Sequence, residues 1–322
     1  MMKPIPTILR SDELINKSLH KASKIDEPYD KIFENKVRKE NIDRIATAES
    51  ASATYLKRIV RKFPTSEKLH PFYEDFLDLK FGIDNYKLSL NNVQWAGEKI
   101  VELATDSIHR LKAARSAYQM VTIRKQFYGR FCSVLEHIDK DLRMLGECRD
   151  FLRKLPEIDT ESPSFIMAGM PNVGKSSLLN SLTNNNVDVA AYPFTTLNVF
   201  IGHMKVKGRN IQVVDTPGLL DRPIEKRNEL EKRSILSLKD IRGVILFIMD
   251  YSGFSGYTLE EQEELYQEIK RLFHKKIIRV QTKIDISDRK EDVAVSNINK
   301  QGIDELRSLI EREINEFTDY GY

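Results

Sequence analysis

One short segment, 168-AGMPNVGKSSLLN-180, limits the folds open to this chain more than any other stretch. It matches the pattern GxxxxGK[ST] through Gly169, Gly174, Lys175 and Ser176, and it lies between an apolar run and a leucine-rich run. Glycine lets the backbone curl so that consecutive N–H groups point inward, and a helix that begins directly afterwards adds the positive end of its dipole. The segment therefore predicts a phosphate-binding loop between a buried strand and a helix, because a chance glycine turn would not explain the lysine and serine together.

The polar residues of this loop have distinct expected roles. Lys175 is expected to neutralise charge on the outer phosphates, and Ser176 to offer its hydroxyl to Mg²⁺. The expected ligand is therefore a nucleotide with bound magnesium. The residues predicted to surround the phosphates are Gly169, Pro171, Asn172, Val173, Gly174, Lys175, Ser176, Ser177 and, from a later segment, Gly218.

Two later segments complete the predicted phosphate site. The run 211-IQVVDTPG-218 is typical of a buried strand ending in Asp215, which is placed to bind Mg²⁺ through water, followed by a glycine whose N–H can meet a γ-phosphate. The polar loop 193-PFTT-196 offers Thr196, with Thr195 as the alternative, to complete the Mg²⁺ shell and to sense the γ-phosphate. Because hydrolysis removes the group that orders both loops, the arrangement predicts a molecular switch.

Base selection is predicted from the end of another strand, 282-TKID-285. Asp285 can accept two N–H groups that guanine has and adenine lacks, while the stem of Lys283 packs over the ring. Ser296 and Asn297 stand in a small-residue loop suited to offering a backbone N–H to the guanine O6. The predicted guanine site comprises Thr282, Lys283, Asp285, Ser296 and Asn297, which favours GTP and GDP as ligands.

The residues before the phosphate loop read as helical. A chain of 322 residues has room for two domains. Apolar residues recur at three and four over 28–63, and helical periodicity continues near 70–79, over 85–118 and over 120–155. A break is expected near Gly129 or a few residues earlier. The fold predicted for this part is an α-helical N-terminal bundle.

The second half predicts an α/β P-loop GTPase domain, with a mostly parallel sheet and helices on both faces. The segment 155-LPEIDTESPS-164 reads as a linker, so the domains are predicted to cover 1–157 and 158–322. The segment 193-PFTT-196 is expected to lie in a polar loop that follows 183-TNNNVDV-189. The expected strands are 164–169, 211–215, 243–250 and 277–281, and the expected helices lie near 175–184, 228–239, 258–273 and 302–317.

Composition excludes several classes of protein. Hydrophobic residues make up 41% and charged residues 31%, as in an ordinary globular protein. The two cysteines, Cys132 and Cys148, form no CxxC pair and have no histidine at ligand spacing, which predicts reduced thiols in a cytoplasmic protein. The longest apolar run, 244-VILFIM-249, is too short to cross a bilayer, and the N-terminus has no apolar signal core, so neither export nor membrane insertion is expected.

Charge is unevenly distributed along the chain. Up to residue 160 there are 29 Lys and Arg against 24 Asp and Glu, and afterwards 22 against 24. No acidic residue lies between Asp106 and Glu136, where a basic helix with Tyr118, Phe127 and Tyr128 could follow RNA phosphates and stack on bases. The alternative is a solvated charged face over aromatic core residues. The RNA-contact candidates are Arg110, Lys112, Arg115, Arg124, Lys125 and Arg130.

Several segments resemble a known family. The second half is similar to translation-factor-related GTPases close to the Obg group, and the chain resembles the short archaeal form of the nucleolar GTP-binding protein family. The resemblance implies a role in assembly of the large ribosomal subunit, with its precursor, ribosomal RNA and other assembly proteins as partners. The segments that carry it are 70-HPFYEDF-76, 86-YKLSL-90, 124-RKQFYGR-130, 193-PFTT-196, 200-FIGHM-204 and 215-DTPGLLDRPIEKRN-228.

Some positions depart from related GTPases. Thr282 stands where the family usually has asparagine, and its hydroxyl can still bond the phosphate loop, while Asn297 replaces a usual alanine. Leu219 stands where Ras-like switches have the glutamine that orients the attacking water, so slow intrinsic hydrolysis is expected, with a partner, a backbone group or a cation supplying the missing function. By resemblance to related GTPases Asn172 is a candidate for holding K⁺, with bracing of the loop as the alternative. His203 is expected to be a structural residue at a strand edge, with a catalytic base as the alternative.

Three classes of function follow from these features. The leading prediction is a GTP-hydrolysing molecular switch in large-subunit assembly. The second is a structural assembly protein that binds ribosomal RNA and keeps its nucleotide as a static brace. A metabolic ATPase or nucleotide kinase is disfavoured, because 282-TKID-285 favours guanine and no acceptor-binding lid is evident.

Overall fold

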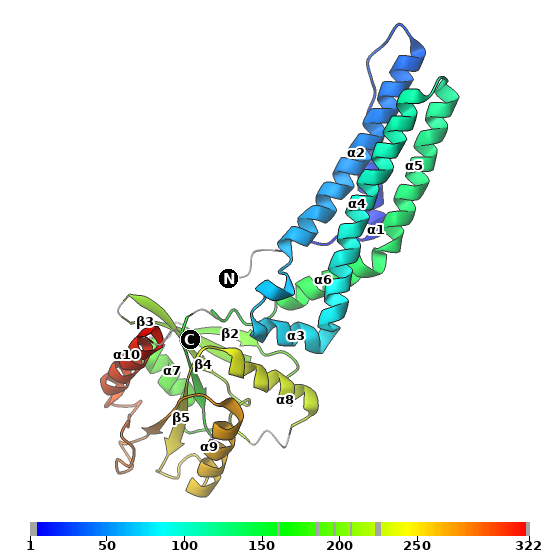
Figure 1. Cartoon of the computed structure of the whole chain (residues 1–322). Helices are drawn as coiled ribbons and strands as arrows, with labels where there is room; N and C mark the ends of the chain where they lie inside the picture. Colours follow the sequence, from blue (N-terminus) through cyan, green and yellow to red (C-terminus); the bar gives the residue numbers. More distant parts are fainter. Residues whose placement is uncertain are drawn as a thin grey trace. The chain divides into compact units, whose positions relative to one another are not determined.

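The computed structural model describes residues 5–159, 162–183, 187–195, 198–206, 208–222 and 227–319 (Figure 1). Thr196, which was predicted to bind Mg²⁺, lies outside these ranges. The helices of the first half are α1 (Ser11–Ser23), α2 (Phe33–Lys62), η1 (Ser66–Lys68), α3 (Pro71–Phe81), α4 (Ile83–Ala113), α5 (Ala117–His137) and α6 (Asp139–Leu152). The second half contains β1 (Ser164–Ala168), α7 (Lys175–Thr183), β2 (Val187–Ala191), β3 (Asn198–Val206), β4 (Arg209–Asp215), α8 (Glu229–Leu236), η3 (Ser237–Asp240), β5 (Gly243–Asp250), α9 (Leu259–Phe273), β6 (Ile277–Thr282) and α10 (Ile303–Asp319).

The chain divides into two compact units that do not follow the sequence order. We call residues 5–69 and 80–153 the helical unit, and residues 70–79 and 154–319 the sheet unit. The predicted helical N-terminal region and the predicted α/β domain are both confirmed as folds. The predicted domain boundary between residues 157 and 158 stays a prediction.

The helical unit is held together by the long helices α2 and α4, which pack on each other and are joined by α1, α5 and α6 (Figure 1). Its core is apolar and aromatic: Ile45 and Leu56 of α2 are fully buried, and so are Tyr86 of α4 and Phe131 of α5. Tyr86 also satisfies its hydroxyl by donating to the carbonyl of Pro64 at 2.7 Å. Because these large apolar side chains are buried on one face of each helix, they recur in the sequence at helical spacing, and this spacing predicted the helices.

One expectation about these helices was wrong, and one helix was missed. The break expected near Gly129 lies instead at Ile138, between α5 and α6. Gly129 sits within α5 on an exposed face, where glycine costs a helix only about 1 kcal/mol. The helix α1 was not expected, because its buried positions include Ser11 and Ser18 and its apolar pattern is therefore weak.

The sheet unit has six strands in the order β2-β3-β4-β1-β5-β6. The four expected strands are present, and β4, β1, β5 and β6 run parallel, so their carboxyl ends share one edge. The hairpin of β2 and β3 was missed, and it adds two antiparallel strands beside β4. The strand β2 begins at Val187, within the segment 183–189 that precedes the predicted polar loop. Figure 1 shows α7 and α10 on one side of the sheet and α8 and α9 on the other.

The helix α3 belongs by its contacts to the sheet unit, although it lies between helices of the other unit in the sequence. Phe76 is fully buried and meets the ring of Tyr192, just after β2, edge to face at 5.5 Å between ring centroids. The hydroxyl of Tyr73 donates to the carbonyl of Ile158 at 3.0 Å, and Asp78 lies 3.6 Å from Arg233 of α8. Aromatic burial of this kind anchors α3 on the sheet unit.

Candidate functional site

The phosphate loop connects β1 to α7 through a backbone that only glycine can follow at two points. Gly169 has φ 137°, and a Cβ there would lie 2.5 Å from the carbonyl oxygen of Ile248. Gly174 has φ 101°, also in the region that favours glycine. Asn172 adopts φ 62° and is exposed. Pro171 and Ser177 also reach solvent to differing degrees, whereas Val173 is buried beneath the loop.

Lys175 lies inside the curl of this loop. Only 6% of the residue is exposed, and Nζ donates to the carbonyls of Gly169 and Met170 at 2.8 Å each. Burial lowers the pKa of Lys175, because the charged form loses its hydration. The loop thus holds a poorly hydrated ammonium group that an anion would stabilise.

Ser176 and Asp215, which the sequence predicts to be magnesium ligands, are hydrogen-bonded to each other. The hydroxyl of Ser176 donates to Asp215 Oδ2 at 2.7 Å, and Asp215 is fully buried at the end of β4. Burial raises the pKa of Asp215, although the hydrogen bond from Ser176 acts the other way. Among the described residues, no group donates to the buried Asp215 Oδ1. A hydroxyl beside a carboxylate with a spare oxygen fits Mg²⁺, which takes few protein ligands and completes its shell with phosphate and water.

The two predicted switch segments are partly described. Thr195 donates its hydroxyl to the carbonyl of Tyr192 at 2.9 Å. Gly218 has φ 75°, and its N–H donates to Asp221 Oδ2 at 2.7 Å. Leu219 is fully buried, so its side chain contributes to packing. This apolar side chain brings no polar group to the position where Ras-like switches have glutamine.

The base-recognition segments come together at the carboxyl ends of β5 and β6. Thr282 Oγ1 donates to the carbonyl of Val173 at 2.5 Å, which ties β6 to the phosphate loop. Asp285 accepts a hydrogen bond from Ser296 Oγ at 2.6 Å. Asn297 Nδ2 donates to the carbonyl of Gly174 at 3.3 Å, so the loop at 296–297 also contacts the phosphate loop. All the described residues predicted for this site therefore lie at one edge of the sheet.

Sequence reasoning missed Asp250, which contacts Lys283 of the predicted base-recognition segment. This fully buried carboxylate at the end of β5 accepts from Lys283 Nζ at 2.7 Å and from the N–H of Ser255 at 2.9 Å. Burial alone would raise the pKa of Asp250, but the hydrogen bonds from Lys283 and Ser252 hold it below its usual value. The signal was an acidic residue closing the apolar run 243-GVILFIMD-250, at the same end as Asp215 closes its strand.

The basic candidates for RNA contact lie on the helical unit. Lys112, Arg115, Lys125 and Arg130 are exposed, whereas Arg110 and Arg124 are half-buried. Among the interleaved aromatic residues, Tyr118 is 82% exposed, but Phe127 is buried in the core and stacks on Phe131 at 5.7 Å. The core alternative is therefore right for Phe127, which is not available to stack on a base.

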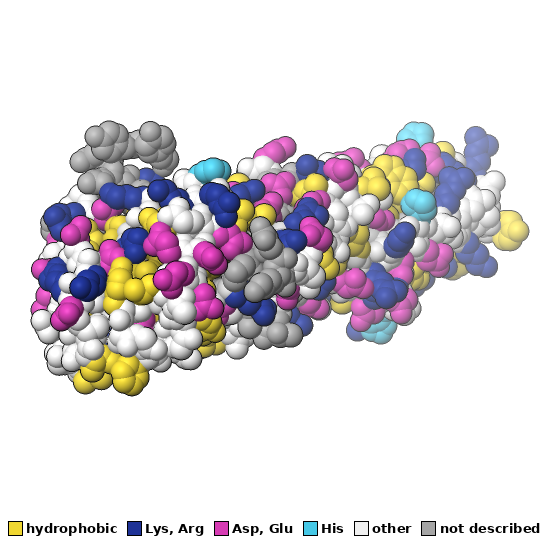
Figure 2. Space-filling model, turned by 90° about the horizontal axis from the view of Figure 1, so that it is seen from below, with side chains coloured by type: hydrophobic (Ala, Val, Ile, Leu, Met, Phe, Trp, Pro, Cys, Tyr) yellow, Lys and Arg dark blue, Asp and Glu magenta, His cyan; other side chains and the backbone are white. Residues whose placement is uncertain are grey.

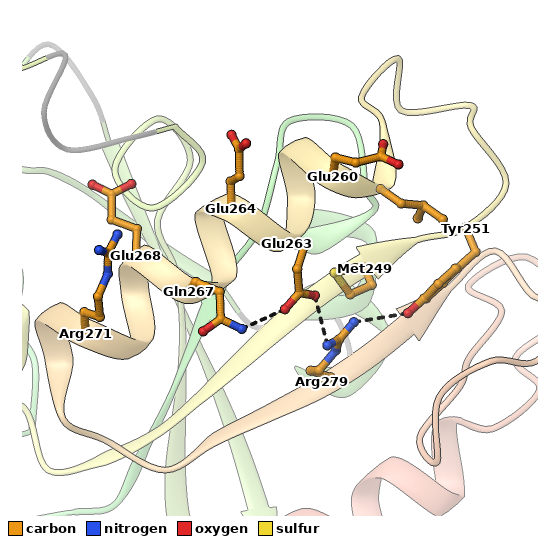
Figure 3. A pocket seen from close by; sticks show the side chains of 10 residues that line it. Met249, Tyr251, Glu260, Glu263, Glu264, Gln267, Glu268, Arg271 and Arg279 are labelled. Carbon is orange, nitrogen blue, oxygen red and sulfur yellow. Dashed lines mark hydrogen bonds and ion pairs between the residues drawn. The ribbon is translucent and has the colours of Figure 1, made fainter.

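Other charged features lie outside the predicted site. His203 of β3 pairs with Asp188 of β2 at 3.3 Å, which agrees with a structural role. A cavity of about 920 Å³ lies between α9 and the strands β5 and β6, where Arg279 contacts Glu263 and the hydroxyl of Tyr251 (Figure 3). On the face drawn in Figure 2, basic and acidic side chains are interspersed, so that face presents no broad field of one sign.

Two further structural tests concern metals and membranes. Within the described ranges, no group of three or more His, Cys, Asp or Glu side chains is placed to hold a metal ion. The Ser176 and Asp215 pair therefore remains the candidate, with phosphate and water as the other ligands. None of the helices in the described ranges combines the length and apolar character that crossing a bilayer requires.

Comparison with known proteins assigns both halves of the chain. Residues 2–159 match the model of the NOG1 N-terminal helical domain, and residues 164–283 match that of the 50S ribosome-binding GTPase. An uncharacterized protein of Methanocaldococcus jannaschii is 37% identical over 297 residues, which cover 89% of this chain and 81% of that protein. Nucleolar GTP-binding protein 1 of Arabidopsis thaliana is 36% identical over 275 residues, which cover 85% of this chain and 40% of that protein.

A solved structure of a nucleolar GTP-binding protein 1 homologue from Plasmodium falciparum is 34% identical, with a TM-score of 0.46, and the alignment covers 51% of this chain and 92% of that one. The present chain spans only 35% to 53% of the length of the curated relatives named nucleolar GTP-binding protein 1.

Proposed function

Because this chain belongs to the nucleolar GTP-binding protein family, we propose that it binds GTP and GDP with Mg²⁺, hydrolyses GTP, and acts as a switch in large ribosomal subunit assembly. One observation carries the proposal. The phosphate loop, the Ser176–Asp215 pair and the Asp285–Ser296 pair lie at the carboxyl edge of one sheet, where open α/β sheets bind ligands. Thr282 and Asn297 join the base-recognition segments directly to that loop.

The proposed magnesium ion would be held by Ser176 and, through water, by Asp215, with Thr196 as a further candidate. When bound, Mg²⁺ would neutralise charge on the phosphate oxygens. Lys175 would exchange its hydrogen bonds to the carbonyls of Gly169 and Met170 for hydrogen bonds to phosphate oxygens. The phosphate would then give the buried ammonium group an anionic partner. Asp285, steadied by Ser296, would accept the two guanine N–H groups.

We propose that hydrolysis is slow without a partner. Leu219 is buried and apolar, so it cannot hold the attacking water as a glutamine would. Asn172 is exposed on the loop and remains the candidate for holding K⁺ beside the phosphates. The test is multiple-turnover hydrolysis in KCl and in NaCl at equal ionic strength. Equal rates would remove the role of K⁺, and no turnover in either salt or with ribosomal particles would favour the static-brace alternative.

Guanine selectivity is tested by competition. ATP should fail to displace labelled GTP, and Asp285→Asn should weaken guanine binding and shift the preference toward xanthosine nucleotides, because the exchange of a carboxylate for an amide reverses one hydrogen-bonding position. Asp304→Asn, an exposed change on α10, is the matched control. Displacement of GTP by ATP at similar concentrations would point instead to the metabolic ATPase class.

The switch itself is tested by co-sedimentation with large-subunit particles in GTP, GDP and a non-hydrolysable GTP analogue. Occupancy should differ between the triphosphate and GDP if hydrolysis times release, because a switch needs different affinities in its two states. Equal occupancy in all three would support a static brace. The nucleolus in the relatives' name refers to those proteins, and the cytoplasmic location expected from this sequence stays a prediction.

We propose that the basic face of α5 contacts ribosomal RNA. The exposed Lys125 and Arg130 and the half-buried Arg124 support this, as does the exposed Tyr118. Changing Arg124, Lys125 and Arg130 to glutamine should weaken particle binding and lower the slope of log affinity against log salt by about 2 to 3, at about 0.9 per lost phosphate contact. GTP affinity should not change. A slope equal to that of a control triple on α2, at Lys57, Arg61 and Lys62, would contradict the RNA contact.

A further inference from the structure

Asp221 accepts a hydrogen bond from the backbone N–H of Gly218, the group that the proposed function assigns to the third phosphate. The distance from this nitrogen to Asp221 Oδ2 is 2.7 Å, and only 9% of Asp221 is exposed. The same turn contacts the phosphate loop, since the N–H of Gly169 donates to the carbonyl of Leu220 at 2.9 Å.

A buried arginine holds this arrangement from behind. The side chain of Arg227 is 0% exposed. Its Nη2 donates to the carbonyl of Gly218 and, at 2.9 Å, to the carbonyl of Leu219. The same nitrogen lies 3.7 Å from Asp221 Oδ1. Within the described residues, Nε and Nη1 of Arg227 have no hydrogen-bond partner. A desolvated guanidinium needs an anion nearby, and Asp221 supplies it here.

We propose that Asp221 is a specificity-determining residue that occupies the γ-phosphate position at Gly218 and so selects against the nucleoside triphosphate relative to the diphosphate. This inference rests on the proposed guanine-nucleotide site. A single N–H donates fully to one strong acceptor, so a third phosphate can use Gly218 only after the carboxylate leaves. Two anions at one donor also repel each other. A diphosphate lacks the group that would compete, so it binds with Asp221 in place.

The alternative is that Asp221 merely fixes the turn, in which case its loss would affect both nucleotides alike. The two roles differ in the ratio of affinities. Asp221→Asn keeps the size of the side chain and removes its charge, so it weakens the competitor without opening a cavity. Replacing a charged acceptor by a neutral one is expected to improve binding of the triphosphate by about tenfold relative to the diphosphate.

The experiment measures equilibrium binding of fluorescent GDP and of a non-hydrolysable GTP analogue, with Mg²⁺, to the full chain. Wild type should favour GDP, and Asp221→Asn should raise the affinity for the analogue about tenfold while the GDP affinity stays within about twofold. Asp304→Asn, exposed on α10, should leave the ratio at the wild-type value. An unchanged ratio in Asp221→Asn, or a weaker affinity for the analogue, overturns the inference.

Two further readouts keep the outcomes distinct. Asp221→Ser, which removes the carboxylate and keeps a small polar side chain, should shift the ratio in the same direction, and an opposite shift would contradict the proposal. GDP binding by each variant reports that the site is folded. If wild type binds neither nucleotide, both the proposed function and this inference are wrong. If wild type binds both nucleotides but the ratio of their affinities does not change in the Asp221 variants, only this inference is wrong.

Discussion

Thr282 supplies a single hydroxyl group that joins two parts of the proposed nucleotide site. Its Oγ1 donates to the carbonyl of Val173 at 2.5 Å and lies 3.2 Å from that of Met249, and the residue is fully buried. Related GTPases usually place asparagine there. The shorter side chain makes the same kind of link to the phosphate loop, so the departure from the family pattern preserves the connection.

Thr282→Val should therefore destabilise the sheet unit by about 1–3 kcal/mol, since it keeps the shape of the side chain but leaves a buried carbonyl without its donor. Guanine-nucleotide affinity should fall as well, because the phosphate loop loses a tie to β6. Urea unfolding and nucleotide titration measure the two effects. Thr105→Val, an exposed change in α4, is the control, and a loss no greater than that of the control would contradict the role given to the hydroxyl.

The contacts at residue scale that were predictable share one property: the residues lie close together in the sequence or close a buried strand. Lys175 and Ser176 belong to one motif, and Asp215 ends an apolar run. The partners of Gly218 were not predictable. Asp221 and Arg227 reach it through a folded turn, and neither residue type signals such a contact by its spacing.

At the scale of elements, the position of β2 at the edge of the sheet explains why the sequence did not predict this strand. The strand β2 lies at the edge of the sheet, and its burial pattern leaves Asp188 and Val189 exposed, so it reads as a polar loop. Its partner β3 passes very close to α7: a Cβ on Gly202 would come within 2.4 Å of Thr183 Cγ2. This close approach brings together residues that are far apart in the sequence, so no local sequence pattern predicts it.

The first turn of α1 is fastened to α6 through Asp139. The Arg10 guanidinium beside it, together with hydrogen bonds from the N–H and Oγ of Ser11, holds the pKa of Asp139 well below its usual 3.8. A carboxyl group with a lowered pKa in the folded state stabilises the protein above its unfolded pKa, and this contribution is lost as the pH falls below about 3.9.

Asp139→Ala should accordingly lower the stability of the helical unit by roughly 1 kcal/mol at neutral pH, through loss of the hydrogen bonds to Ser11. The difference from wild type should shrink as the pH drops below about 4. Chemical unfolding at pH 7 and at pH 3 measures it. Asp84→Ala, an exposed change in α4, should show no such convergence, and a pH-independent deficit in Asp139→Ala would refute the electrostatic explanation.

The helix α3 makes a separate prediction through Phe76. The ring is fully buried and meets Phe72 at 5.0 Å and Tyr192 at 5.5 Å, both edge to face. Phe76→Ala should cost the sheet unit about 3–5 kcal/mol, because it opens a cavity among aromatic side chains. Unfolding followed by a probe in the sheet unit tests this. Leu88→Ala, at an exposed site of α4, is the comparison, and an equally small effect would show that α3 does not stabilise the sheet unit.

At the scale of the whole molecule, the chain passes between its two units three times, near residues 69, 79 and 153. The sequence predicted both folds but not this path, because the periodicity of α3 is that of any amphipathic helix and does not reveal which unit it covers. The contacts that assign α3 to the sheet unit come from distant parts of the chain, and Tyr192, the ring partner of Phe76, lies more than a hundred positions away.

Ligand binding should make this path visible by hydrogen exchange. If GDP and Mg²⁺ bind as proposed, at 100 times the dissociation constant they stabilise the sheet unit by about 2.7 kcal/mol. Amide exchange in α3 should then slow together with that of β1 and β5, because helices that open with one cooperative unit share its stability. Exchange in α2 and α4 should change little. Slowing in β1 and β5 without slowing in α3 would contradict the assignment of α3.

The placement of α3 also limits how such a protein can be recombined. A gene segment that begins after residue 153 encodes the sheet but omits the aromatic helix that covers Tyr192, so a chimera made at that joint would inherit a bare apolar patch. A segment ending there would carry the buried Phe76 without Tyr192. A chimera that preserves this contact therefore has to take α3 and the sheet unit from the same source.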